Sequence, residues 1–257
     1  MSFRSSPARV VSWILRAVLV TTTAAAAAAT PTSARVPVLV ELFTSQSCSS
    51  CPPAEALTQQ LYREQPIDGV ELLVLAEHVD YWNHLSWHDP YSSAERTERQ
   101  RRYARQLGNG GRVYTPQAVV DGRFDVIGSQ RDDLIAAIQQ AARAAHAPLR
   151  FDVQPSGHRR WQIRVTPLPP AAGAIDYAVA LVQDGVITSI PRGENAGARL
   201  VEDSVVLQWI EADERGLADL QLPALPDAGG WRVIVFAQRR DIGAVIGSAQ
   251  QRLSTSR

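Results

Sequence analysis

The chain has 257 residues, 26 basic and 26 acidic side chains, and a formal net charge of zero at pH 7. That length suits one large domain or two ordinary ones, and the 45% hydrophobic content is that of a soluble globular protein. The balanced charge gives no electrostatic reason to expect a nucleic acid or an anionic membrane as a partner.

Residues 1–34 have the pattern of an export signal. Arg4 and Arg9 precede a mainly apolar stretch over residues 10–20, which Arg16 interrupts, and an Ala-rich tract follows. Small residues up to Ala34 offer a cleavage site, with Ala29 as a second candidate. We therefore predict a periplasmic or secreted protein with no membrane span in the mature chain, and an uncleaved anchor as the alternative. Such compartments are oxidising, so disulfides persist there.

The only two cysteines, Cys48 and Cys51, lie between a predicted buried strand over residues 36–43 and a predicted helix over residues 54–64. This order places a thiol at a helix N-terminus, where the helix dipole and free N–H groups favour the thiolate. The pair could be redox active, part of a zinc site or a structural disulfide. Zinc needs about four ligands and no second Cys pair exists, while so short a disulfide loop stabilises little. The pattern therefore favours redox chemistry.

Glu41 is a carboxylate inside the first apolar strand, seven residues before Cys48. One interpretation places it at a strand end or edge in water. The other makes it a semi-buried acid that moves protons for the thiols. The strand itself is continuous in Val and Leu, as is typical of a strand covered on both faces.

A second apolar strand, over residues 70–76, leads directly into a segment rich in His and Trp. That segment contains His78, Asp80, Trp82, His84 and His88. Parallel neighbouring strands bring their C-terminal ends together, so we expect the segment to border the thiols. It could be an aromatic and polar wall of the site, a metal site, or a packed loop. We predict that His78→Ala slows disulfide exchange without unfolding the protein; a packing role for His78 predicts the reverse.

The next segments read as a helix over residues 91–107, a hairpin and a helix over residues 131–145. Thr115-Pro116 opens the first strand of the hairpin, where a proline is tolerated. Asp121-Gly122 between two β-rich runs is a strong turn signal.

From residue 147 onward the pattern changes to short, mostly alternating runs separated by Pro- and Gly-rich turns. We predict a second, all-antiparallel β domain resembling a sandwich. The polar glycine loop over residues 192–199 lacks phosphate-loop spacing and reads as a turn, and we expect no cofactor. The predicted division is an export signal at 1–34, a first domain at 35–147 and a second at 148–257.

The order of strand, Cys-x-x-Cys, helix, strand, helix, Thr-Pro, hairpin and helix resembles the thioredoxin superfamily. The resemblance implies that Pro116 is a cis-proline beside the Cys pair and that Thr115 presents its backbone to the substrate. It also implies a role for an acidic residue upstream of the Cys pair, and Glu41 is similar to that residue but stands one position further from the cysteines. The central dipeptide here is Ser49-Ser50 rather than the Gly-Pro of thioredoxin.

More closely, the sequence from Val40 through Thr44-Ser45 to Cys51-Pro52-Pro53 resembles an exported family, domain of unknown function 1223. Three further motifs are similar to those of that family: His78-Val79-Asp80-Tyr81-Trp82, Tyr114-Thr115-Pro116-Gln117 and Gly193-Glu194-Asn195. This resemblance spans most of the mature chain and contains His78 without requiring His84 or His88, which weighs against a three-histidine metal site.

The predicted fold class is therefore an α/β thioredoxin-like domain followed by an all-β antiparallel, sandwich-like domain. The predicted function is thiol–disulfide exchange on a protein or small-thiol disulfide substrate. Cys48 attacks, Cys51 resolves the mixed disulfide, and Pro116 holds the substrate backbone. Glu41 is the candidate acid, and the candidate substrate contacts are Thr115, His78, Asp80 and Trp82. The alternatives are a copper-handling protein using Cys48, Cys51 and His78, and a non-catalytic binding module with the cysteines permanently oxidised.

Overall fold

The computed structural model describes residue 1 and residues 35–108, 110–223 and 230–253. The predicted export signal lies outside the described residues. No helix in these ranges is long and apolar enough to cross a membrane. The helices are α1 (Pro52–Glu64), α2 (Ala94–Gln106), α3 (Arg131–Ala142) and a short 3-10 helix, Pro170–Ala172. The strands are β1 (Val36–Thr44), β2 (Val70–His78), β3 (Gln117–Val120), β4 (Phe124–Ile127), β5 (Arg150–Gly157), β6 (Arg160–Thr166), β7 (Ile175–Gln183), β8 (Val186–Ser189), β9 (Arg199–Glu202), β10 (Val205–Glu211), β11 (Leu217–Gln221), β12 (Trp231–Arg239) and β13 (Val245–Leu253).

The first part of the chain folds into the elements that the sequence predicts. Strands β1 and β2 are parallel, in a register that ends with Thr44 opposite His78. Strand β3 is antiparallel to β1, and β4 is antiparallel to β3. The predicted hairpin turn is confirmed: Asp121 and Gly122 both have positive φ angles, and the Arg123 N–H donates to the Val120 carbonyl oxygen at 2.9 Å to close the turn. This arrangement brings the ends of β1 and β2 together at the start of α1.

The predicted fold class is wrong, because the two halves of the chain share one sheet. The largest sheet is mixed and eight-stranded, in the order β13-β12-β7-β10-β2-β1-β3-β4. The joint between the halves is narrow: β10 pairs with β2 in parallel at Val205 and Ala76 only. The described residues from 35 onward cluster as one compact unit. The protein is thus mostly β, and the predicted boundary at residue 147 falls between α3 and β5, with strands of the eight-stranded sheet both before and after it in the chain.

The sheet is curved, since residues of β1 and β13 lie in one core although four strands separate them in the sheet order. This shared core contains Leu39 and Leu73 from the first half and Val182, Phe236 and Val245 from the second. Its burial removes apolar surface of both halves from water, and each Å² so buried stabilises the folded state by about 25 cal/mol. The halves therefore stabilise each other through common packing.

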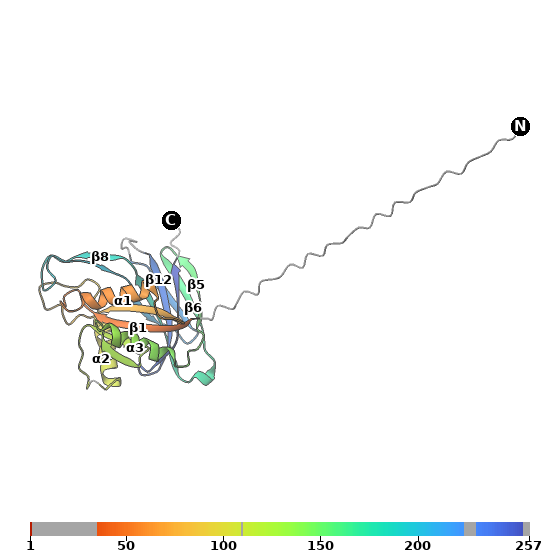
Figure 1. Cartoon of the computed structure of the whole chain (residues 1–257), viewed down its shortest axis with the longest axis horizontal. Helices are drawn as coiled ribbons and strands as arrows, with labels where there is room; N and C mark the ends of the chain where they lie inside the picture. Colours follow the sequence, from red (N-terminus) through yellow and green to blue (C-terminus); the bar gives the residue numbers. More distant parts are fainter. Residues whose placement is uncertain (2–34, 109, 224–229, 254–257) are drawn as a thin grey trace. The chain divides into compact units, whose positions relative to one another are not determined.

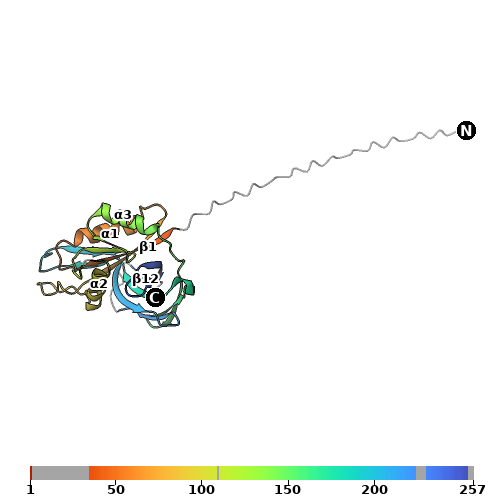
Figure 2. The same ribbon diagram turned by 90° about the horizontal axis from the view of Figure 1, so that it is seen from below.

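Helices and a second sheet cover the remaining faces. Helices α1 and α3 pack on the face of β1 that carries Val38, Val40 and Leu42. Helix α2 packs on the opposite face through Tyr103, which meets Phe43. A three-stranded sheet, β11-β6-β5, covers the outer face of β7, β12 and β13. Figure 2 shows α1 and α3 together on one side of β1 and α2 on the other.

A two-stranded ribbon, β8 with β9, stands apart from both sheets. Strand β9 packs against α1, and Figure 1 shows β8 on the same side of the molecule as α1. The loop between these strands returns to the cysteines, so residues of the second half take part in the candidate site.

Candidate functional site

Cys48 and Cys51 form a disulfide at the N-terminus of α1. Cys51 is the residue that caps the helix, and Pro52 and Pro53 occupy its first turn, where no N–H partner is needed. The side chains are almost entirely buried, with exposed fractions of 1% for Cys48 and 0% for Cys51. The predicted position of the pair at a helix N-terminus is therefore confirmed.

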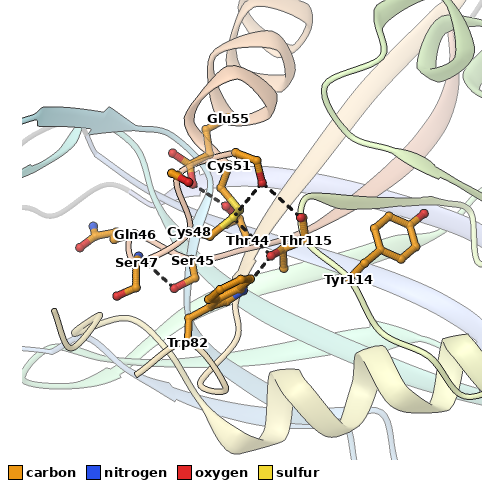
Figure 3. Close-up of a disulfide and its surroundings, with 12 residues drawn as sticks. Thr44, Ser45, Gln46, Ser47, Cys48, Cys51, Glu55, Trp82, Tyr114 and Thr115 are labelled. Atoms are coloured by element: carbon orange, nitrogen blue, oxygen red, sulfur yellow. Dashed lines mark hydrogen bonds between the residues drawn. A yellow bond between two sulfur atoms is a disulfide. The ribbon is translucent and has the colours of Figure 1, made fainter. Parts of the chain in front are cut away.

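Thr115 lies directly beside the disulfide. Its hydroxyl donates to Cys48 Sγ at 3.3 Å and accepts a hydrogen bond from Trp82 Nε1 at 2.8 Å. The Thr115-Pro116 peptide bond is cis, as predicted. Figure 3 shows Trp82 and Thr115 gathered against the disulfide, whereas the ring of Tyr114 extends away from it. Two of the predicted substrate contacts, Trp82 and Thr115, thus form a hydrogen-bonded wall at Cys48.

A second hydroxyl also approaches Cys48. Ser50 Oγ lies 3.3 Å from Cys48 Sγ and 3.5 Å from the carbonyl oxygen of Thr115. A hydroxyl in this place can donate to a thiolate after the disulfide is reduced. Hydrogen bonds to the charged form lower a pKa, so both hydroxyls would favour Cys48 as the nucleophile.

Glu55 is the titratable carboxyl nearest in sequence to Cys51 on α1, and the sequence analysis did not single it out. It follows Cys51 by four residues, the spacing that places two side chains on one face of a helix. The Thr44 hydroxyl, at the end of β1, donates to Glu55 Oε1 at 2.5 Å (Figure 3). Burial and the nearby Glu202 charge raise the pKa of Glu55 to about 8. A carboxyl with that pKa can exchange a proton with a thiol near neutral pH.

His78 is completely enclosed at the end of β2. Its Nδ1 lies 2.7 Å from Asp89 Oδ2, and its Nε2 lies 3.6 Å from Glu202 Oε1. Burial alone would lower the pKa of His78, but the hydrogen bond and charge of Asp89, with Glu202 and Glu55, raise it to about 10. His78 is therefore an imidazolium paired with the buried Asp89 carboxylate, while Glu202, whose own pKa is raised by burial, lies on its other side.

Gln46 connects this histidine to the cysteine loop. Its side-chain amide donates to Glu202 Oε2 at 2.6 Å, and its backbone N–H donates to Asp89 Oδ2 at 2.8 Å. We call Gln46, His78, Asp89 and Glu202 the buried polar cluster. Because Gln46 precedes Cys48 by two residues, the cluster fixes the backbone that leads into the disulfide.

The loop between β8 and β9 holds the outer side of the cysteine loop. Asn195 Nδ2 donates to the carbonyl oxygens of Gln46, at 2.9 Å, and Cys48, at 3.1 Å. The Ser49 N–H donates to Glu194 Oε2 at 3.0 Å, and hydrogen bonding from Ser49 lowers the pKa of Glu194. An ionised carboxylate therefore takes one N–H near Cys48, which opposes part of the thiolate stabilisation expected from the helix N-terminus.

Two predicted site residues make their contacts elsewhere. Glu41 is buried on the α2 face of β1, where its carboxylate accepts hydrogen bonds from Arg99 Nε and the Tyr103 hydroxyl, both at 2.5 Å. Asp80 Oδ1 accepts a hydrogen bond of 2.5 Å from Thr97 of α2. Both carboxylates therefore bind side chains of α2, and these contacts give Glu41 and Asp80 a structural role.

The histidines do not converge on the cysteines. His84 Nδ1 lies 2.7 Å from the carbonyl oxygen of Tyr81, and its ring stacks on Trp82. His88 is exposed. In the part of the chain that the structure describes, no group of three or more His, Cys, Asp or Glu side chains has an arrangement that could hold a metal ion.

Sequence reasoning found the disulfide and its Thr115-Pro116 neighbour but missed most of the polar surroundings. The four-residue spacing from Cys51 was a signal that could have identified Glu55. Asp89 lies within the same His- and Trp-rich segment, but the sequence analysis assigned it no role in the site. Glu194 and Asn195 stand about 145 residues from the cysteines, and local spacing does not predict their contacts with residues 46–49.

Comparison with known proteins gives a family and two structural relatives. The crystal structure of protein AGR_C_4864 from Agrobacterium tumefaciens is similar, with a TM-score of 0.61 and 25% identity over 87% of this chain and 97% of that one. HBP35 of Porphyromonas gingivalis is similar in fold, with a TM-score of 0.57 and 14% identity over 86% of this chain and 76% of that one. No curated protein matches the sequence. The model of the family described as "Protein of unknown function (DUF1223)" matches residues 39–238, and the chain belongs to that family.

Proposed function

We propose that the protein is a thiol–disulfide oxidoreductase acting through Cys48 and Cys51. In the reducing direction, the Cys48 thiolate attacks a substrate disulfide, and one substrate thiolate leaves. The Cys51 thiolate then attacks Cys48 Sγ, which releases the second substrate thiolate and re-forms the Cys48–Cys51 bond. The substrate gains two electrons and the cysteine pair loses two; the oxidising direction is the reverse. Predicted export would bring the protein to a compartment that contains disulfide substrates.

The observation that carries the proposal is the setting of the disulfide at the N-terminus of α1 with the Thr115 hydroxyl on Cys48 Sγ. The helix dipole favours a thiolate at the pair, and the Thr115 hydroxyl contacts the sulfur of Cys48, so it favours Cys48 as the thiolate. A disulfide that only stabilised the fold would gain little here, because it closes a loop of three-residue separation.

The resemblance to the thioredoxin superfamily gives further support. Within the large sheet, the strands of residues 36–127 follow the order β2-β1-β3-β4, in which β1 and β2 are parallel, β3 is antiparallel to β1 and β4 is antiparallel to β3. Helices α1 and α3 pack on the same face of these strands. We propose that this part of the sheet is a thioredoxin-like half of a larger unit, with Pro116 positioning a substrate strand beside Cys48.

Glu55 is the proposed proton carrier for Cys51. In the reducing direction its carboxylate accepts the Cys51 proton before Cys51 attacks, and in the oxidising direction its carboxyl returns that proton to the leaving Cys51 thiolate. A pKa of about 8 is close to that of a free thiol, about 8.5, so the transfer costs little in either direction. Glu41, which is bound by Arg99 and Tyr103, has no part in this proposal.

The burial of both sulfur atoms favours one rival, a binding module whose cysteines stay oxidised. Mixed-disulfide trapping separates the two functions. Cys51→Ala keeps the proposed nucleophile and removes the resolving thiol, so this variant, expressed in an exporting cell, is expected to accumulate covalent adducts that dithiothreitol releases. The matched control, Cys48→Ala, should accumulate far fewer. Equal trapping by the two variants, or trapping by neither, would contradict the assigned roles.

A further inference from the structure

A separate cavity opens where β10 leaves β2. These strands pair only at Val205 and Ala76, and β10 has an irregular register between Val206 and Gln208. The N-terminal part of α2 lies in the resulting wedge. The cavity there has a volume of about 460 Å³, and its lining includes Tyr91, Arg96, Val206, Leu207, Gln208 and Trp209. That volume lies within the range of small-molecule sites.

Arg96 is a buried cation without a direct partner. Its exposed fraction is 5%, and among the described residues its guanidinium group has no hydrogen-bond partner and no ion pair within 4.0 Å. Its guanidinium carbon lies 5.4 Å from the centroid of the Trp209 ring. The side-chain nitrogen atoms of Arg96 have no hydrogen-bond partner, yet none of them is fully shielded from solvent. The guanidinium group therefore reaches the open space of the cavity. A buried charge without a hydrogen-bonding partner is costly, and an anion in the cavity would remove that cost.

The nearby carboxylates leave this charge unpaired. Glu77 is the largest attractive influence on Arg96, yet its Oε1 lies 3.7 Å from Arg99 and outside ion-pair distance of Arg96. Burial, and then the charge of Glu41, raise the pKa of Glu77 well above its usual range, which favours a neutral carboxyl. Glu95 also lines the cavity, but it is exposed, and water and salt screen its charge.

The rest of the lining indicates what kind of anion fits. Val206, Leu207 and Trp209 offer apolar surface next to the guanidinium group. The first turn of α2 begins after Ser93 and contributes the positive end of its dipole. A ligand that suits both parts has one carboxylate and an apolar body.

We propose that this cavity binds a small organic carboxylate, whose carboxylate pairs with the planar fork of Arg96 and whose apolar body packs on Trp209. The guanidinium fork matches a carboxylate in a bidentate manner, which gives selectivity for the ion over a neutral isostere. The proposal is independent of the cysteine chemistry.

The test is titration calorimetry of the full mature chain with benzoate, hexanoate and phenylacetate, with benzyl alcohol and inorganic phosphate as comparison probes. At least one carboxylate should bind, and benzyl alcohol should not. Arg96→Gln should weaken that binding about tenfold or more, whereas Arg102→Gln, an exposed change on the same helix, should leave it unchanged.

A second variant keeps the test informative if Arg96→Gln does not fold. Leu207→Trp fills the cavity and leaves residue 96 an arginine, and it should also abolish binding. The proposal is overturned if none of the three carboxylates binds wild-type protein, or if binding survives both variants. It is also overturned if only phosphate binds, because the apolar lining would then have no role.

Discussion

Replacing His78 with alanine is expected to lower the free energy of unfolding by about 3–5 kcal/mol near neutral pH, because it leaves the buried Asp89 carboxylate without its cation. Asp89 and Glu202 are 0% and 3% exposed, so water cannot replace the imidazolium. His78 binds these two acids, and both acids accept hydrogen bonds from Gln46, so the main role of His78 is to fix the backbone that leads to Cys48. This expectation reverses the sequence-based prediction that the variant slows exchange without unfolding.

The pH dependence of stability has a definite sign. Folding raises the pKa of His78 from 6.5 to about 10, so the folded state holds the proton more tightly than the unfolded state. The stabilisation is complete below pH 6.5 and is lost as the pH rises toward 10. In that window wild-type stability should fall by up to about 1.4 kcal/mol per pH unit through this group, and the variant should lack that component.

Urea unfolding followed by tryptophan fluorescence measures the loss, and ultraviolet absorbance of the reduced protein measures the thiolate titration. His158→Ala, an exposed change in the β5–β6 turn, is the control and should alter neither quantity. An unchanged unfolding midpoint for His78→Ala together with a shifted thiol pKa would instead assign His78 to the thiol chemistry.

Replacing Glu55 with glutamine is expected to slow reduction of the disulfide by dithiothreitol about a hundredfold, the lower end of what a positioned acid or base contributes. Glutamine keeps the size of the side chain and a hydrogen bond with Thr44, so the fold should be retained. In this direction the carboxyl must be protonated, because it gives a proton to the leaving Cys51 thiolate.

The pH profile distinguishes proton transfer from a packing effect. The raised pKa of Glu55, about 8, keeps the carboxyl protonated below that pH, so the ratio of wild-type to variant rate should be largest there and should fall above it. Glu64→Gln, at the exposed end of α1, should give a ratio near one throughout. A pH-independent ratio for Glu55→Gln would exclude it as the proton carrier.

The first half of the fold was predictable because its signals are local. The predicted strands over residues 36–43 and 70–76 are mainly apolar, and α1 follows Cys51 and begins with two prolines, which the first helical turn tolerates. The Asp121-Gly122 turn fixes the β3–β4 pairing directly. Each of these features depends on residues close together in the chain.

The sequence analysis assigned the second half to a separate domain because its pairing with β2 joins residues that are far apart in the chain, and no local pattern indicates it. The apolar runs in β7 and β12 are continuous rather than alternating, and both of their faces are buried. One face meets the three-stranded sheet and the other meets the core shared with β1 and β2. The parallel joint rests on one residue pair, Val205 with Ala76, which has no sequence signature.

The candidate site divides in the same way. Cys48, Cys51 and the Thr115-Pro116 pair were found because their spacing and order follow a known pattern. Glu41 was chosen by sequence proximity, but strand alternation turns it toward α2, where Arg99 and Tyr103 bind it. Contacts from Glu194 and Asn195 depend on the eight-stranded sheet, which brings the β8–β9 loop back to the cysteines.

The central claim is that Cys48 and Cys51 form a reversible redox pair in the folded protein, and equilibrium titration in glutathione redox buffers tests it most directly. Alkylation of free thiols followed by mass measurement gives the fraction of reduced protein at each buffer ratio. The account predicts one two-electron transition, with identical curves from the oxidised and the reduced starting states, while tryptophan fluorescence shows a folded chain throughout. A disulfide that yields only after the protein has been unfolded would contradict the account.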